Sequence, residues 1–168
     1  MKQLSLLAIP LALSACASQP MAPMNVPDAV KVPATAGYTM TLVGAGDLTY
    51  ECRTAATGTA WAFVGPNAAL KKTSGEVVGK YYGGPTWEGN DGSKVVGKQL
   101  AISPAAAGNI PLQLVEVTQT MGTGMLVGTK YIQRLNTLGG VAPATACATA
   151  NVGEKQVVKY QADYAFYK

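Results

Sequence analysis

The sequence predicts an all-β protein, either an antiparallel β-sandwich or a partly open barrel, with short helical turns only. Its 19 glycines and 10 prolines are spread along the chain and separate short runs rich in β-branched and aromatic residues. No segment keeps a helical spacing of apolar residues over three turns. Together these observations favour many short strands joined by turns.

The first expected strands are Tyr38–Val43 and Leu48–Cys52, joined by a glycine-rich hairpin turn at Gly44–Asp47. In the second strand Leu48, Tyr50 and Cys52 share one face because side chains alternate along a strand. Further strands are expected at 61–63, 112–117, 125–135, 157–160 and 164–167.

Two copies of Val-Val-Gly-Lys, within Glu76–Lys80 and Lys94–Lys98, predict matching strands on either side of one loop. The best candidates for helical turns are Pro66–Lys72 and Pro104–Gly108, both short and interrupted.

The amino-terminal residues 1–15 have the plan of a secretory signal: Lys2, an apolar run from Leu4 to Leu13, and small residues before Cys16. The run is too short to span a bilayer as a helix, which takes about 20 residues. Leu13–Cys16 resembles the lipobox of bacterial lipoprotein precursors, which implies that Cys16 carries diacylglycerol and a further acyl chain such as palmitate. A plain secretory signal with an incidental cysteine is the alternative. Ala17 stands where an inner-membrane retention aspartate would be, so this resemblance implies outer-membrane anchoring, facing the periplasm or the exterior.

Residues 16–37 hold four prolines and predict an extended tether between the lipidated cysteine and a single β-rich domain at 38–168. With Cys16 acylated, Cys52 and Cys147 remain. In an exported protein such a pair predicts a disulfide, and two buried thiols are the alternative.

Composition and motifs exclude several classes of function. The net charge of +4 comes from scattered basic residues, so we expect no nucleic-acid partner. The absence of histidine excludes Ser-His-Asp and Cys-His catalysis and removes the commonest zinc ligand. The glycine-rich segments lack the spacing of phosphate-binding loops, and we expect no cofactor and no metal. Calcium at the oxygens of Glu88, Asn90 and Asp91 is a weak alternative.

Glu88 and Asp91, next to Trp87, form the one carboxylate pair that resembles a site, since paired carboxylates can divide acid and base roles. Trp87 could stack on a sugar ring. The competing interpretation is structural, because Asn90-Asp91-Gly92 is a turn signal. Arg134 could bind an anionic ligand or, as we prefer, tie carbonyls or a carboxylate together across the core.

Several motifs resemble those of domain-of-unknown-function family 3455, a family of small exported bacterial and fungal proteins. They include Gly84–Ser93 (GPTWEGNDGS) and Tyr131–Pro143 (YIQRLNTLGGVAP), and the resemblance covers about 40–167. It implies no assigned activity. The chain departs from the family pattern before the Gly-Pro-Thr-Trp run, where a histidine is common and Lys80-Tyr81-Tyr82 stands here, and at Leu112, where a tryptophan is frequent.

The sequence therefore predicts an uncharacterised lipoprotein, anchored to the membrane through Cys16, that acts as a non-catalytic binding or structural module. An envelope glycan or another envelope protein is the expected partner, with Gly83–Ser93 as the contact loop. A histidine-free glycan hydrolase using Glu88 and Asp91 is the alternative.

Overall fold

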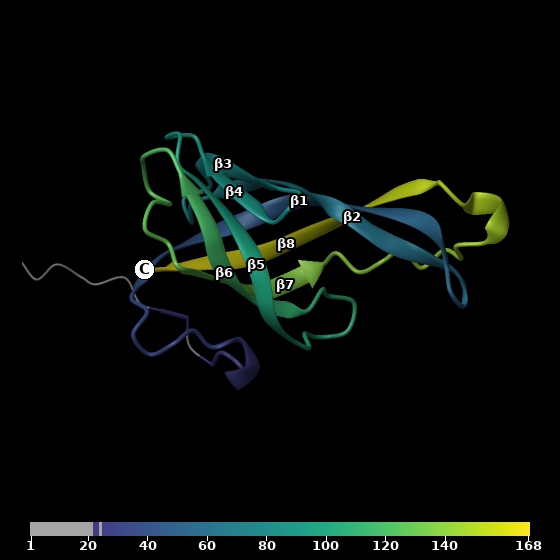
Figure 1. The fold of residues 1–168 in the computed structure, drawn as a ribbon, viewed down its shortest axis with the longest axis horizontal. Coiled ribbons are helices and arrows are strands. Elements are labelled where there is room, and N and C mark those ends of the chain that lie inside the picture. The colour runs from purple at the N-terminus through teal and green to yellow at the C-terminus, as the bar shows by residue number, and fades with distance from the viewer. Residues whose placement is uncertain (1–21, 24) are drawn as a thin grey trace, which may run out of the picture.

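The computed structural model describes residues 22, 23 and 25–168, and in these the chain forms eight strands and two 3-10 turns (Figure 1). The predicted all-β class is confirmed. No helix among these residues has the length and apolar character needed to cross a membrane. The elements are η1 (Asp28–Val30), β1 (Tyr38–Ala55), β2 (Gly58–Lys71), β3 (Val77–Tyr82), β4 (Thr86–Gly89), β5 (Lys94–Ser103), β6 (Leu112–Met121), β7 (Tyr131–Gly139), η2 (Thr149–Asn151) and β8 (Lys155–Tyr167).

The strands form a closed barrel in which each strand pairs antiparallel with the next and β8 pairs with β1. Of the two predicted arrangements the barrel is the one observed, and its sheet closes fully. Closure leaves the barrel strands without free hydrogen-bonding edges. It also encloses an interior, which receives every second side chain.

The interior is filled at one end of the barrel. Phe166 on β8, Leu70 on β2 and Ile132 on β7 are fully buried there. Leu126, from the connection between β6 and β7, is also fully buried in this cluster and seals the end. We call this the closed end.

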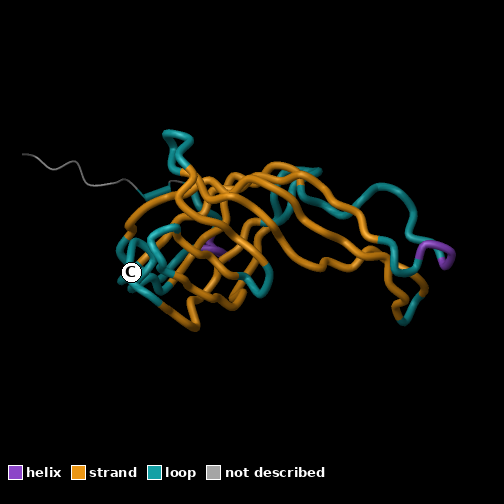
Figure 2. The backbone as a smooth tube through the Cα atoms, turned by 90° about the horizontal axis from the view of Figure 1, so that it is seen from above, coloured by secondary structure: helices purple, strands orange, loops and turns teal. Residues whose placement is uncertain are grey.

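The strands β1, β2 and β8 are longer than the others and run beyond the barrel as an arm, on the right of Figure 1 and Figure 2. We define the arm as residues 51–62 and 143–157. The predicted disulfide is confirmed and lies here: Cys52 and Cys147 are bonded across a sequence separation of 95, with Cα atoms 5.4 Å apart. The indole Nε1 of Trp61 also donates to the carbonyl of Thr145 at 2.7 Å.

The second half of the predicted tether is part of the folded unit. Val30 of η1 is fully buried against Leu114 and Leu135 on the outside of the barrel. Gln133 Nε2 donates to the carbonyl of Val30 at 2.5 Å, and the Gly37 amide donates to the carbonyl of Lys168 at 2.8 Å. The predicted signal peptide and the predicted lipidation site Cys16 lie outside the described residues.

The predicted turn at Gly44–Asp47 is wrong, because β1 runs unbroken through it. A Cβ at Gly44 would lie 2.4 Å from the ring of Tyr164, and one at Gly46 would lie 2.3 Å from the carbonyl of Asn67. Both glycines therefore allow neighbouring groups to approach the backbone of β1 closely. A glycine needed for this reason cannot be told from a turn glycine by its local sequence.

Four other elements differ from expectation. Pro66–Lys72 falls in strand β2 up to Lys71, and Pro66 lies just before β2 begins to pair with β3 at Asn67. Pro104–Gly108 forms a bend and turn with no helix. The expected strand from Met125 begins only at Tyr131, and the two expected strands near the carboxyl end are one continuous β8.

Candidate functional site: a cavity at the mouth of the barrel

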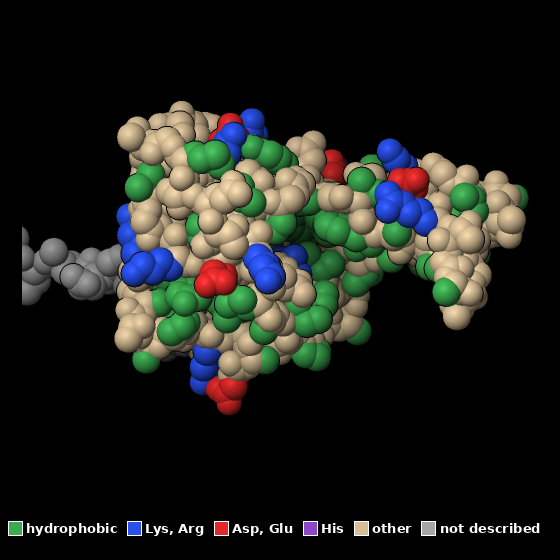
Figure 3. Space-filling model, viewed as in Figure 1, with side chains coloured by type: hydrophobic (Ala, Val, Ile, Leu, Met, Phe, Trp, Pro, Cys, Tyr) green, Lys and Arg blue, Asp and Glu red, His purple; other side chains and the backbone are tan. Residues whose placement is uncertain are grey.

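The end of the barrel next to the arm, which we call the mouth, is hollow. A cavity of about 560 Å³ opens there, lined by residues from every strand except β4. In Figure 3 it is the dark recess at the base of the arm, with hydrophobic side chains around it and basic side chains at its rim. The lining consists of Leu48, Tyr50, Phe63, Val64, Gly65, Pro66, Tyr81, Gly84, Pro85, Gly97, Lys98, Gln99, Ile110, Pro111, Gln113, Arg134, Tyr160 and Tyr164.

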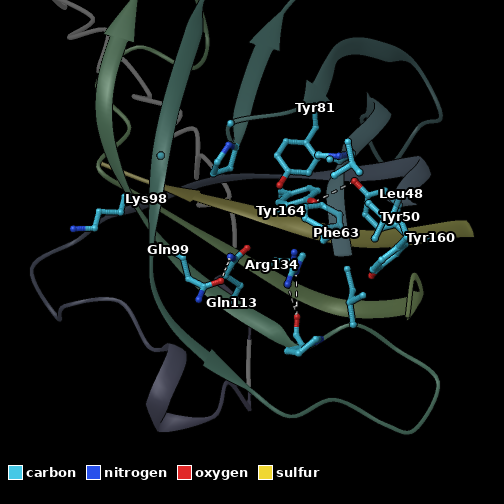
Figure 4. Close-up of a pocket in the computed structure, with 18 residues that line it drawn as sticks. Leu48, Tyr50, Phe63, Tyr81, Lys98, Gln99, Gln113, Arg134, Tyr160 and Tyr164 are labelled. Atoms are coloured by element: carbon cyan, nitrogen blue, oxygen red, sulfur yellow. Dashed lines mark hydrogen bonds between the residues drawn. The ribbon is translucent and has the colours of Figure 1, made fainter. Parts of the chain in front are cut away.

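One side of the cavity is aromatic. Tyr50, Phe63, Tyr81, Tyr160 and Tyr164 lie together in the close-up (Figure 4). A bulge in β2 opposite Thr49 and Tyr50 leaves Val64 without a partner, so that Phe63 and Val64 both reach the lining. Bulges redirect side chains in this way.

The other side is polar and centres on Arg134. In Figure 4 Arg134 lies between the glutamines Gln99 and Gln113 and the aromatic group. Its guanidinium donates from Nε and Nη2 to the carbonyl of Pro111, at 3.1 and 2.8 Å. The preferred sequence interpretation, a tie to a backbone carbonyl, is what the geometry shows. These two bonds fix the plane of the guanidinium, which has five N–H donors in all.

Gln113 is the cross-strand neighbour of Arg134, so the two side chains share the inner face of the sheet. Its Nε2 donates to Gln99 Oε1 at 2.6 Å, while its own Oε1 is buried and has no hydrogen-bond partner among the described residues. A buried acceptor without a donor is costly. This oxygen therefore favours a hydrogen-bond donor from a bound molecule.

The charge of the lining is entirely positive. Among the described residues that border the cavity, Arg134 and Lys98 are cations and no aspartate or glutamate is present. Arg134 is half-buried and Lys98 is exposed. The cavity therefore combines an apolar, aromatic side with a fixed positive group.

The tyrosines remain protonated over the physiological range. Burial raises the pKa of Tyr50 and of Tyr81, and the nearby positive charge of Arg134 opposes this in both cases. Burial also raises the pKa of Tyr164, whose hydroxyl lies 3.3 Å from that of Tyr160. Tyr50 donates to the carbonyl of Gly140 at 2.8 Å. The hydroxyls are therefore neutral polar groups on an otherwise apolar side.

Trp87 does not lie on an exposed contact loop, because the segment Gly83–Ser93 contains strand β4 and the indole points into the barrel. It is fully buried. Its ring stacks on Tyr81 with centroids 4.7 Å apart and meets Tyr164 edge to face at 5.6 Å. Trp87 thus supports two residues of the cavity from beneath and is not itself part of the lining.

Glu88, the next residue, points to the outside of the barrel and lies between two lysines. Its carboxylate is 3.2 Å from Lys80 Nζ and 2.9 Å from Lys94 Nζ. The Tyr82 hydroxyl donates to it at 2.6 Å. The hydrogen bond from Tyr82, followed by those from Lys94 and Lys80, lowers the pKa of Glu88 to about 2. A carboxyl held ionised in this way does not suit the general-acid role of a glycosidase.

Asp91 stabilises a turn and also the β6–β7 connection that covers the closed end. It accepts from the hydroxyl of Ser93 at 2.6 Å and from the amide of Met125 at 2.7 Å, one residue before Leu126. The pKa of Asp91 is lowered, mainly by the hydrogen bond from the Ser93 hydroxyl and next by the one from the Met125 amide. No cluster of three or more potential metal-ligating side chains occurs among residues 22, 23 and 25–168. The structural interpretation of Asn90-Asp91-Gly92 therefore fits the geometry.

Of the candidate residues named from the sequence, the structure brings only Arg134 to the cavity. Sequence reasoning missed Tyr160, Tyr164, Gln99 and Gln113. One sequence signal could have identified the two tyrosines. Tyr160, Ala162, Tyr164 and Phe166 alternate along one strand, which places three aromatic rings on the same face.

The fold and the cavity define a closed, eight-stranded antiparallel barrel with an open mouth lined by tyrosines and one inward-facing arginine. Residues 33–168 match the model of a family described as Protein of unknown function (DUF3455), and the chain belongs to that family. No curated protein matches the chain. No solved structure matches it.

Proposed function

We propose that this protein is a non-catalytic binding module that holds a small, largely apolar molecule in the mouth of the barrel. The cavity is the observation that carries the proposal. Its volume of about 560 Å³ falls within the range of small-molecule sites, about 300–1,000 Å³. Eight-stranded barrels are wide enough to hold one small ligand.

The rigidity of the walls supports binding. Hydrogen bonds of the closed sheet fix the strands that form the lining, and the disulfide fixes the arm beside it. A site on rigid elements loses little conformational entropy when it binds. The glycan-hydrolase alternative finds less support, because Glu88 and Asp91 are each engaged by structural partners and neither lines the cavity.

We further propose that the protein is exported, acylated at Cys16 and anchored to the outer membrane. The lipobox-like Leu13–Cys16 and the apolar run before it support this. The disulfide between Cys52 and Cys147 supports an oxidising compartment. The proposed partner of the cavity is then a small molecule of the cell envelope.

Binding is tested with the neutral fluorescent probe N-phenyl-1-naphthylamine, titrated into the purified protein. We expect saturable fluorescence enhancement with one site per chain. Val64→Trp should abolish the enhancement, because Val64 lines the cavity and an indole in its place would fill space that the probe needs. Val77→Trp is the matched control, since Val77 is 51% exposed and Val64 43%, both on strands, but Val77 lies away from the lining. Equal binding by the two variants, or none by the wild type, would contradict the proposal.

Anchoring is tested by growing an expressing bacterium with radiolabelled palmitate and separating its membranes. The wild type should carry the label and sediment with the outer membrane. Cys16→Ser should lose both properties. A soluble, unlabelled wild-type protein would contradict the anchor and leave the binding proposal standing.

A further inference from the structure

The cavity has two chemically different sides, and this division indicates what kind of molecule fits it. Rings from β1, β2, β3 and β8 form the apolar side, and Arg134 with the two glutamines forms the polar side (Figure 4). A wholly apolar ligand would leave the polar side without partners. A wholly polar ligand would gain nothing from the rings.

The arginine sets the charge of the preferred ligand. The guanidinium donates one N–H from Nε and one from Nη2 to the Pro111 carbonyl. Three of its five N–H donors therefore have no partner among the described residues. No carboxylate of the protein lines the cavity to neutralise it. A planar guanidinium with free donors matches the two oxygens of a carboxylate.

The environment strengthens this preference. Arg134 is near enough to Tyr50, Tyr81, Tyr160 and Tyr164 for its charge to act on all four hydroxyls. A charge partly surrounded by rings is screened less than one in water. Lys98, exposed at the rim, adds a second positive charge to the approach.

We infer that the ligand is an apolar monocarboxylic acid, whose carboxylate is bound by Arg134 and whose hydrocarbon body lies against the tyrosines and Phe63. This rests on the proposed function and adds the chemical class of the ligand. Lys98 assists approach, and Arg134 forms the direct contact.

The test compares two probes with the same chain, decanoate and decanol, as competitors of N-phenyl-1-naphthylamine at pH 7.5. Decanol is the less water-soluble of the two, so non-specific adsorption would favour it. We expect decanoate to displace the reporter at a concentration at least about tenfold lower, the effect of one charge-assisted hydrogen bond.

Arg134→Met should remove the preference for decanoate once competition is corrected for the reporter affinity measured in the same variant, and Arg134→Lys should restore part of the preference. Arg53→Met is the matched control, because Arg53 is the only other arginine and lies on the arm. It should keep the full preference. Circular dichroism and melting temperature establish that each variant is folded.

The two proposals fail differently. If decanol competes as well as decanoate, or if Lys98→Met and not Arg134→Met removes the preference, the inference about the carboxylate and Arg134 is overturned while the binding site stands. If the reporter and both competitors fail to bind, or if Val64→Trp leaves binding unchanged, the binding site itself is overturned.

Discussion

The two ends of the barrel use the same sheet for different purposes. At the closed end Phe166, Leu70 and Ile132 are fully buried and the interior is filled. At the mouth the lining includes four tyrosines, two glutamines and Arg134, whose side chains end in polar groups, and a cavity of about 560 Å³ remains. Along β8 the change takes place between Phe166 and Tyr160. The comparison indicates that the closed end is packed throughout, whereas at the mouth buried residues such as Tyr164 border a cavity that a ligand can enter.

The largest effect that tests this division is on stability. Phe166→Ala should lower the free energy of unfolding by about 3–5 kcal/mol, because it removes a buried ring from a filled interior. Phe63→Ala at the mouth, where the ring is 53% exposed, should cost less than about 1 kcal/mol. Urea unfolding measures both. Equal losses would show that the mouth is as important to stability as the closed end.

The arm provides a second contrast. Replacing Cys52 and Cys147 together by alanine should lower the free energy of unfolding by about 2–5 kcal/mol, since the bond closes a long loop in the unfolded chain. The affinity for N-phenyl-1-naphthylamine should not change in the folded variant, because neither cysteine lines the cavity. Calorimetry and probe titration separate the two. A loss of binding without a loss of stability would mean that the arm shapes the site.

A smaller effect concerns the mouth alone. The buried Oε1 of Gln113 lacks a donor among the described residues, next to Arg134. An acid with a hydroxyl near its carboxylate, such as 3-hydroxydecanoate, should therefore bind several-fold more tightly than decanoate. Gln113→Leu should remove this gain and keep the binding of decanoate. An unchanged gain in this variant would assign the hydroxyl to another group.

The smallest expected effect is a pH-dependent change in stability at Glu88, on the outer surface of the barrel. The pKa of Glu88 is lowered to about 2 from 4.5, so its ion pairs stabilise the folded state fully above pH 4.5. That contribution is lost as the pH falls from 4.5 towards 2. Glu88→Gln should lower the melting temperature slightly at pH 7, and the difference should vanish near pH 2. Glu116→Gln, an exposed site on β6, is the comparison. A difference that persists at pH 2 would indicate packing as its cause.

The strand content and the disulfide could be predicted because they depend on local composition and on the count of cysteines. The face formed by Leu48 and Tyr50 was also predictable, since alternation is a local property. The continuity of β1 was not, because the glycines at 44 and 46 are required by Tyr164 and Asn67, far away in sequence.

The site was largely beyond local reasoning. Trp87 and Glu88 attract attention as neighbours in sequence, but consecutive residues of a strand point to opposite faces, one into the interior and one to the lysines outside. The cavity residues come from seven strands and from the connections β3–β4 and β5–β6, and they gather only when the barrel closes. Arg134 was identifiable as one of two arginines, whereas its position beside four tyrosines depends on strand register.

The docking of the amino-terminal segment has a consequence for orientation at a membrane. Ala22 borders one surface pocket together with Tyr38 and Tyr167, which pair at the end of β8 that is farthest from the arm. From Cys16 to the first described residue, Ala22, six residues of chain can reach at most about 20 Å. A lipid on Cys16 would therefore keep the sealed pole of the barrel near the bilayer and turn the opening towards the aqueous space, where it could receive molecules from solution.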